Sequence, residues 1–256
     1  MDLMAAGATP VHRLDPRAKV VTTTVFLLAV VSFPRHEMIR LLPYLLFPVW
    51  LAAVAGLGFG YVAKRLLVVS PFALFVAVWN PVFERTPLLA FGSWMISPGW
   101  LSFLSIMTRF VLTVSAALVL MATTGFQSVC LGMEKLGMPR ALVVQLQFLY
   151  RYIFVLGEEA ARLSRARSLR SFGGRGMGMK VYGQLIGSLL IRTLDRAQRV
   201  STAMLCRGYD GEVRILRPLE FTAADALHIA GWTVFFLLMR FVDAPELLGS
   251  MITGGA

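Results

Sequence analysis

The residues of this chain best suited to binding chemistry are arginines that recur at helical spacing. Arg192, Arg196, Arg199, Ala203 and Arg207 follow one another at steps of four, three, four and four residues. These steps place them in one stripe along a helix. A guanidinium group carries a fixed fork of donors that suits carboxylates and carbonyl groups. The stripe therefore predicts a contact surface, although a solvated or headgroup-facing helix can carry the same pattern.

Two small-Arg-small triplets accompany the basic segments. The stripe ends in Cys206-Arg207-Gly208, and a glycine just beyond a helix adopts the left-handed cap conformation, so the helix is expected to stop there. The earlier segment "GEEAARLSRARSLRSFGG" contains Arg162 and the triplet Ala166-Arg167-Ser168. It opens with acids and continues with bases, an order that suits the helix dipole. Two such triplets together favour a specific contact over a generic basic face.

Catalytic or metal chemistry has little support in the sequence. The three histidines are scattered, no phosphate-binding loop of the GxxxxGK[ST] type occurs, and Cys130 and Cys206 lack CxxC spacing. We therefore expect no catalytic residue, no metal ligand and no cofactor in this chain. A membrane enzyme acting on lipid phosphates through the basic helices stays open as an alternative. A nucleic-acid-binding role is disfavoured, because the basic residues are not accompanied by aromatic side chains on which nucleobases could stack.

The composition is that of a membrane protein. Of its 256 residues, 57% are hydrophobic and only 15% are charged. Apolar windows of roughly 17–25 residues can cross a bilayer. We read five: Val20–Phe33, Met38–Gly58, Leu66–Phe83, Trp100–Thr124 and about Thr222–Val242. Two more stretches, Ala141–Gly157 and Val181–Ile191, fit amphipathic or protein-buried helices better.

The basic residues predict the orientation. With a cytoplasmic N-terminus, all but five of the 25 basic residues lie in segments placed inside, as the positive-inside rule requires. The five exceptions are Arg35, Arg40, Arg85, Arg109 and Arg240. Arg109 lies in an otherwise apolar helix, so it needs a partner. An intramolecular anchor is favoured over a contact with another membrane subunit.

These features divide the chain into three parts. Residues 1–125 form the N-terminal membrane helices, 126–218 a cytoplasmic module of amphipathic helices, and 219–256 the last membrane helix with the C-terminal tail. Within the module, Gly137–Pro139 predicts a corner and "SFGGRGMGMK" a break. The expected fold is an all-α integral membrane protein with about five transmembrane helices.

The opening segment "HRLDPRAKV" also predicts a local structure. Asp15 can cap a helix that has Pro16 at its first position. Arg17 and Lys19 would then anchor that helix at the inner headgroups. A direct contact with another protein is an equally acceptable interpretation of the same residues.

The chain resembles the CbiQ/EcfT family, the transmembrane components of energy-coupling factor transporters. The resemblance rests on "HRLDPRAKV", "LGMPRALVVQLQFLYRYIFVLGEEAARLSRARS" and "RTLDRAQRVSTAMLCRGYDGE". The Arg-Gly-Tyr-Asp-Gly ending looks like the cobalt/nickel branch. In that family, two Ala-Arg-Gly-type motifs end coupling helices that dock on ATPase subunits. The resemblance places them on Ala166-Arg167-Ser168 and Cys206-Arg207-Gly208, with Ser168 and Cys206 departing from the family residues.

The resemblance implies a set of partners and a role. The chain would be a non-catalytic coupling subunit of an importer for cobalt or nickel ions, with a vitamin importer as the alternative. Its partners would be two ATPase subunits, which use the ATP and magnesium, and a CbiM-like substrate-binding membrane subunit. The supporting basic stripe would consist of Arg162, Arg192, Arg196 and Arg199. The location would be a bacterial or archaeal inner membrane, spanned several times with the N-terminus in the cytoplasm.

Overall fold

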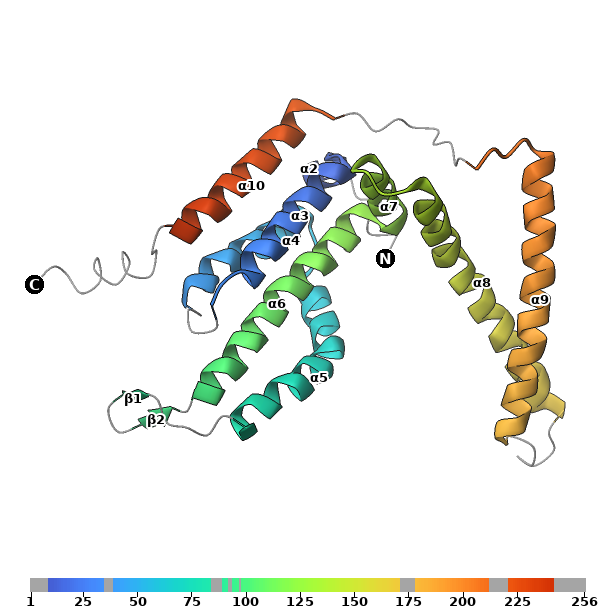
Figure 1. Cartoon of the computed structure of the whole chain (residues 1–256), viewed down its shortest axis with the longest axis horizontal. Coiled ribbons are helices and arrows are strands. Elements are labelled where there is room, and N and C mark those ends of the chain that lie inside the picture. Colours follow the sequence, from blue (N-terminus) through green and yellow to red (C-terminus); the bar gives the residue numbers. More distant parts are fainter. Residues whose placement is uncertain are drawn as a thin grey trace, which may run out of the picture. The chain divides into compact units, whose positions relative to one another are not determined.

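The computed structural model describes residues 9–34, 39–83, 89–91, 94–96, 98–170, 178–211 and 221–241. Helices account for almost all of them (Figure 1). In chain order the elements are α2 (Pro10–Arg13), α3 (Pro16–Val31), the 3-10 helix η1 (Ile39–Leu45), α4 (Leu46–Val54), α5 (Phe59–Phe83), β1 (Leu89–Phe91), β2 (Trp94–Ile96), α6 (Pro98–Thr124), α7 (Phe126–Lys135), α8 (Arg140–Arg170), α9 (Met179–Cys206) and α10 (Ala223–Phe241). The strands form one short antiparallel hairpin.

The chain divides into two compact units. Unit 1 comprises Met1–Met133 and Leu219–Ala256, and unit 2 comprises Glu134–Pro218. In unit 1, α3 packs against α6 and α10, while α4 and α5 pack on α6 (Figure 1). In unit 2, α8 packs against α9. Placing unit 2 in the cytoplasm stays a prediction.

The fold is that of an all-α membrane protein. Four described helices are long and apolar enough to cross a bilayer, over Phe59–Trp79, Gly99–Thr124, Arg140–Arg170 and Ala223–Phe241. Three of these ranges correspond to predicted spans. The range in α8 does not, because its first half was assigned to an amphipathic helix. The mostly exposed apolar side chains of these helices are consistent with contact to lipid.

The first two predicted spans fall on shorter elements. The first lies in α3, which has 16 residues. The second, Met38–Gly58, includes η1, whose interior contains Pro43, and α4, which ends at Val54. Proline removes a backbone donor and disfavours a regular α-helix, which is consistent with the short 3-10 segment around Pro43. Gly56, with φ 67°, then closes α4 with a left-handed turn.

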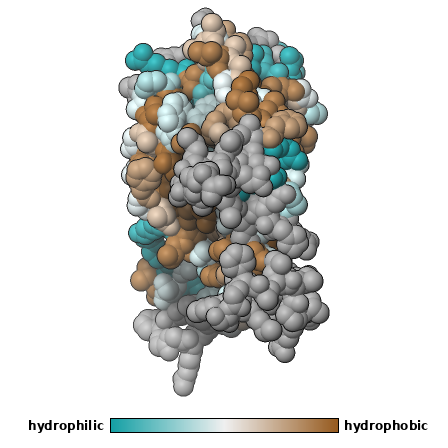
Figure 2. All heavy atoms as spheres, turned by 90° about the vertical axis from the view of Figure 1, so that its left-hand side faces the viewer, coloured by the Kyte–Doolittle hydropathy of each residue, from teal (hydrophilic) through white to brown (hydrophobic). Residues whose placement is uncertain are grey.

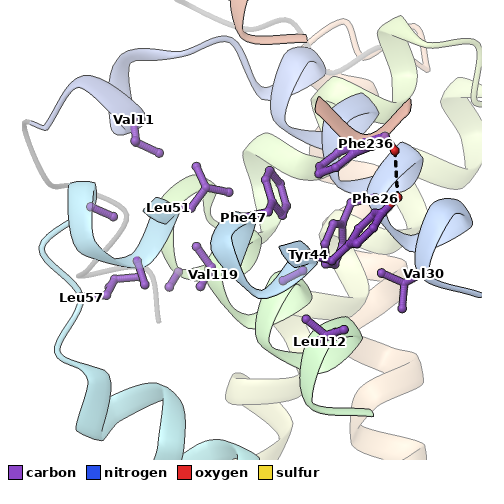
Figure 3. Packing of buried hydrophobic residues seen from close by; sticks show 14 of the residues in the cluster. Val11, Phe26, Val30, Tyr44, Phe47, Leu51, Leu57, Leu112, Val119 and Phe236 are labelled. Carbon is purple, nitrogen blue, oxygen red and sulfur yellow. Dashed lines mark hydrogen bonds between the residues drawn. The ribbon is translucent and has the colours of Figure 1, made fainter. Parts of the chain in front are cut away.

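Aromatic rings make up the centre of unit 1. Phe26 of α3 lies 4.8 Å from Phe47 and 5.5 Å from Phe236 between ring centroids. The Tyr44 hydroxyl donates a 2.8 Å hydrogen bond to the backbone oxygen of Phe236, so a polar tip is satisfied inside an apolar cluster. Figure 3 shows these rings meeting where α3, α4, η1 and α10 converge. The cluster holds elements distant in sequence together.

Apolar side chains also cover much of the outside. Figure 2 shows hydrophobic atoms over a large part of the described surface on the face it presents, interrupted by hydrophilic ones. On α5, Leu67, Val68 and Phe72 are each more than two-thirds exposed. A water-soluble protein rarely shows such continuous apolar surface, whereas a bilayer-embedded helix requires it.

Arg109 of α6 has an intramolecular partner, as the sequence favoured. One terminal nitrogen donates to the backbone oxygens of Phe33 and Pro34, at 2.8 and 3.0 Å. These carbonyl groups belong to the two residues after the C-cap of α3, near the negative end of the helix dipole. The arginine therefore ties α6 to the end of α3.

The opening segment partly follows its prediction. The Asp15 carboxylate accepts a 2.8 Å hydrogen bond from the Arg17 amide, and Pro16 opens α3, which confirms the predicted cap. The headgroup role of Lys19 is wrong. Its side chain is buried, and its ammonium group donates to the backbone oxygen of Thr123 at 3.3 Å. A buried ammonium needs such partners, and only the tertiary fold supplies them.

Candidate functional site: the paired helices of unit 2

The helix that carries the first triplet and the helix predicted before it form one continuous helix. The sequence separated Ala141–Gly157 from the segment that begins at Glu158, but α8 runs without interruption from Arg140 to Arg170. Nothing lies within 4 Å of a Cβ built at Gly157, so this glycine serves no turn. The predicted corner before α8 is confirmed: α7 ends at Lys135 and Gly137 has φ 109°.

The second triplet forms the predicted end of α9. Gly208 has φ 78°. Its amide donates to the Leu205 oxygen and the Tyr209 amide donates to the Met204 oxygen, both at 3.0 Å. This pair of bonds is the Schellman motif, which satisfies the last carbonyl groups of a helix. The cap fixes the backbone at Arg207, whose side chain is exposed.

The first triplet lies inside the last described turn of α8. Its helix continues to Arg170, and the predicted break at 171–177 lies outside the described residues. The Ser168 hydroxyl donates to the Arg165 oxygen at 2.8 Å. Arg167 is half-buried, and its Nε atom has no hydrogen-bond partner among the described residues. The two triplets thus differ: one is a capped helix end, and the other is helical throughout.

One carboxylate joins the arginines of the two helices. Glu159 of α8 contacts Arg162 of the same helix and Arg192 of α9, each at 3.0 Å. Two of the four members of the supporting stripe, Arg162 and Arg192, therefore lie at one charge cluster. Because Arg192 is 59% exposed, water screens much of the attraction, and the pair contributes more to register than to stability. The sequence did not identify Glu159 as the partner, because its position opposite α9 depends on how the helices pair.

An apolar groove of about 580 Å³ lies between α8 and α9. Phe148, Tyr152 and Leu156 line it from α8, at successive steps of four residues along one helix face. Met204 and Tyr209, which flank the capped end of α9, line the other side together with Arg196. These apolar residues were not predicted from the sequence, although their spacing of four residues could be read there. Arg196 and Arg199 both border a smaller polar recess near Glu159.

The two cysteines differ in environment. Cys130 of α7 is buried, and this burial raises the pKa of its thiol. Cys206 is exposed beside Arg207. Among the residues that the structure describes, no group of three or more histidines, cysteines or acids could hold a metal ion. The geometry of unit 2 suits recognition by arginines and apolar side chains.

Comparison with known proteins places the whole arrangement in context. The model of the family CbiQ, described as a cobalt transport protein, matches residues 7–216. An EcfT, the energy-coupling factor transporter transmembrane protein, from Leuconostoc gelidum subsp. gasicomitatum is 26% identical over 91% of this chain and 94% of its own length. An uncharacterized protein of Methanocaldococcus jannaschii is 30% identical, covering 54% of this chain and 53% of that protein. The cobalt transport protein CbiQ of Rhodobacter capsulatus is 34% identical, but the match covers 38% of this chain and 40% of that protein.

Proposed function

The chain belongs to the CbiQ family of cobalt transport proteins, and on this basis we propose that it is the transmembrane coupling subunit of an ATP-driven energy-coupling factor importer. In this role it transmits motion from two ATPase subunits to a substrate-binding membrane subunit. The ATPases bind ATP and magnesium, and this chain performs no catalysis. The match to an EcfT over nearly the full length of both chains supports the assignment.

The capped end of α9 is the observation that carries the proposal. A Schellman motif holds Arg207 at the tip of a 28-residue helix, exposed and next to a residue without a side chain. A helix of this length extends about 42 Å at 1.5 Å per residue. A capped tip positions the guanidinium group for carboxylates or carbonyls of a partner groove. Cys206, Arg207 and Gly208 therefore form the principal docking contact in this proposal.

The second contact in the proposal is Ala166-Arg167-Ser168 on α8. Arg167 is half-buried, and its buried Nε atom has no hydrogen-bond partner among the described residues, so docking that opens this site to a carbonyl or carboxylate of the partner would satisfy it. Arg162, Arg192, Arg196 and Arg199 support both contacts. Glu159 holds two of them between the paired helices.

We propose cobalt or nickel as the cargo, with a vitamin as the alternative. The CbiQ description and the Rhodobacter relative favour cobalt, whereas the EcfT relatives carry no metal in their names. The substrate-binding subunit, of the CbiM type, would determine the choice. The proposed location is a bacterial or archaeal inner membrane, with the N-terminus and unit 2 in the cytoplasm.

Copurification from native membranes tests the docking contact. The Arg207→Glu variant reverses the charge at the capped tip, and Lys180→Glu makes the same change near the start of α9. We expect Arg207→Glu to lower the recovered ATPase by about tenfold or more, as loss of a central interface arginine does. Lys180→Glu should leave recovery unchanged. Ser168→Gly, which restores the usual family residue, should also be tolerated.

The outcomes separate the alternatives. Equal ATPase recovery with wild type, Arg207→Glu and Arg167→Glu would refute the docking role of the triplets. Absence of any ATPase with the wild-type chain under several mild conditions would refute the transporter role and favour the lipid-phosphate enzyme. Loss with both Arg207→Glu and Lys180→Glu would show that only the overall charge matters.

A further inference from the structure

We propose that Asp225 is a positioning residue for coupling: its carboxylate ties the start of α10 to the start of α3, where both chain connections from unit 2 enter unit 1. The inference rests on the proposed function. It concerns residues that lie in unit 1 and outside the two arginine triplets.

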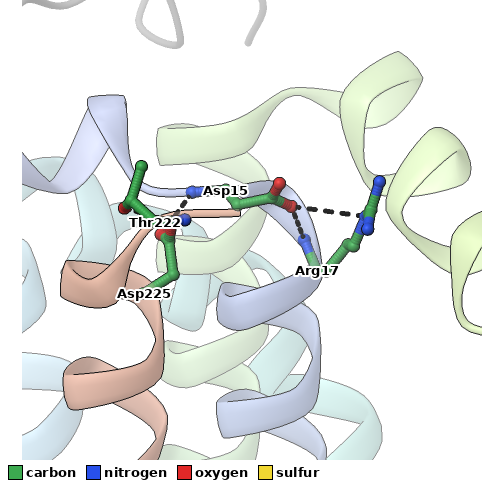
Figure 4. A network of polar contacts seen from close by, with 4 residues as sticks. All are labelled: Asp15, Arg17, Thr222 and Asp225. Atoms are coloured by element: carbon green, nitrogen blue, oxygen red, sulfur yellow. Dashed lines mark hydrogen bonds and ion pairs between the residues drawn. The ribbon is translucent and has the colours of Figure 1, made fainter. Parts of the chain in front are cut away.

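The Asp225 carboxylate is shared by two helices. One oxygen accepts from the Asp15 backbone amide at 2.7 Å. The other accepts from the Thr222 amide at 2.8 Å and from its hydroxyl at 2.6 Å. Figure 4 shows this junction, with Asp15 of the α3 cap beside Thr222 and Asp225. Asp225 is only 1% exposed, and its bond to the Asp15 amide is buried, whereas the two bonds to Thr222 are partly buried.

The arrangement contains the acid's half of a capping box, with an added member. Thr222 and Asp225 have the spacing in which an acid reaches back to the amide before its own helix. The start of α3 has Asp15 as its cap but Ala18 three residues later, so it lacks an acid of its own. Asp225 supplies that acid from α10. One buried carboxylate therefore accepts hydrogen bonds from the cap amides of two helices. The two residues in contact, Asp15 and Asp225, are 210 positions apart in the sequence.

The first connection to unit 2 also reaches this junction. It runs through α7, where a Cβ added at Gly132 would lie 3.2 Å from the Pro16 carbonyl carbon and 3.3 Å from the Arg17 amide. Only a residue without a side chain permits this approach unchanged. The Lys19 ammonium group adds a bond to Thr123, at the end of α6 directly before α7. The start of α3 is thus held against both sides of the α6–α7 turn.

The second connection enters through α10. Residues after α9 lead to Thr222, whose amide and hydroxyl bind Asp225. Both connections therefore join unit 1 at elements bonded to the start of α3. If the Asp225 bonds are lost, α10 and α3 can move separately at this end. The ring cluster around Phe236 would still hold their middle portions together.

Hydrogen exchange in the complete transporter tests this role. The native complex is purified with wild type, with Asp225→Asn, and with Tyr44→Phe as the control for loss of a buried bond elsewhere on α10. Exchange is compared with and without a non-hydrolysable ATP analogue. In Asp225→Asn, we expect protection of the Asp15 amide to fall by about fivefold, the factor for one lost hydrogen bond. Nucleotide-dependent changes in α8 and α9 should persist while those in α3 are lost.

The possible results distinguish the two proposals. Nucleotide changes that reach α3 equally in wild type and Asp225→Asn would overturn the positioning role, as would wild-type changes that stop within unit 2. If the Tyr44→Phe variant loses the nucleotide-dependent changes in α3 to the same extent, general destabilisation would explain the effect. That result would also overturn the positioning role. Absence of nucleotide effects in α8 and α9 of the wild type would refute the proposed function itself. If Asp225→Asn does not accumulate, Asp225→Glu, which keeps the charge but moves the carboxylate by one methylene away from its place beside the Asp15 amide, is measured instead against the same outcomes.

Discussion

The two units differ in where their charged side chains lie: unit 1 buries several of them, whereas those of unit 2 are mostly exposed. Unit 1 buries Asp15, Lys19 and Asp225 and gives each of them hydrogen-bond partners from distant elements. In unit 2, α9 has no buried residue, and its arginines point to solvent or to a single carboxylate. Unit 1 therefore has the interior of a self-contained fold. Unit 2 presents apolar and basic surface, as a module that acts by binding would.

This difference separates residues that shape the protein from residues available to partners. Removing a buried group in unit 1 should change folding, because its neighbours lose contacts that water or lipid cannot replace. Removing an exposed group of unit 2 should change assembly and leave folding nearly intact. Matched substitutions in the two units test this division.

The largest expected difference is between Phe236→Ala and Leu194→Ala. Phe236 contacts a ring cluster, so its loss should cost about 3–5 kcal/mol. Leu194 is 56% exposed, so the same truncation should cost within about 0.5 kcal/mol. Thermal unfolding of the purified chain in mild detergent measures both. Similar midpoints for the two variants would contradict the proposed contrast.

Alanine at two glycines should give different effects on stability. Gly157→Ala in α8 has open space around it and should stabilise the helix by about 0.5–1 kcal/mol. Gly132→Ala in α7 should lose that gain, because its Cβ would press on backbone atoms of Pro16 and Arg17. The same unfolding measurement compares them. A gain at Gly132 as large as that at Gly157 would show that α7 can move away from α3 freely.

The smallest expected difference concerns polar bonds. Tyr44→Phe removes a buried hydrogen bond and should cost about 1 kcal/mol. Glu159→Gln weakens an exposed ion pair and should cost about 0.5 kcal/mol or less, and less still in high salt. Unfolding midpoints at low and high salt provide the test. A larger, salt-insensitive effect of Glu159→Gln would contradict this expectation. It would show that the Glu159–Arg192 pair is less accessible to solvent than its exposed fraction indicates.

Local features of the fold were predictable because neighbouring residues produce them. The Asp15 cap, the Gly137 corner and the left-handed Gly208 each depend on bonds within one turn, and all three are confirmed. The division of α8 into two helices was wrong, because a glycine inside a helix is only weakly unfavourable. The apolar face that lines the groove was readable at steps of four but was not recognised.

The sequence by itself determined the membrane class, the family resemblance and the helix ends, since composition, motifs and capping signals are properties of short segments. Only the tertiary structure decided which distant groups the charged side chains contact. Asp225 reaches the cap of α3, Arg109 reaches carbonyl groups after α3, and Glu159 reaches α9. Each contact joins residues tens to hundreds of positions apart. The physical reason is that desolvation makes a charge seek a partner, while helix packing determines which partner is near.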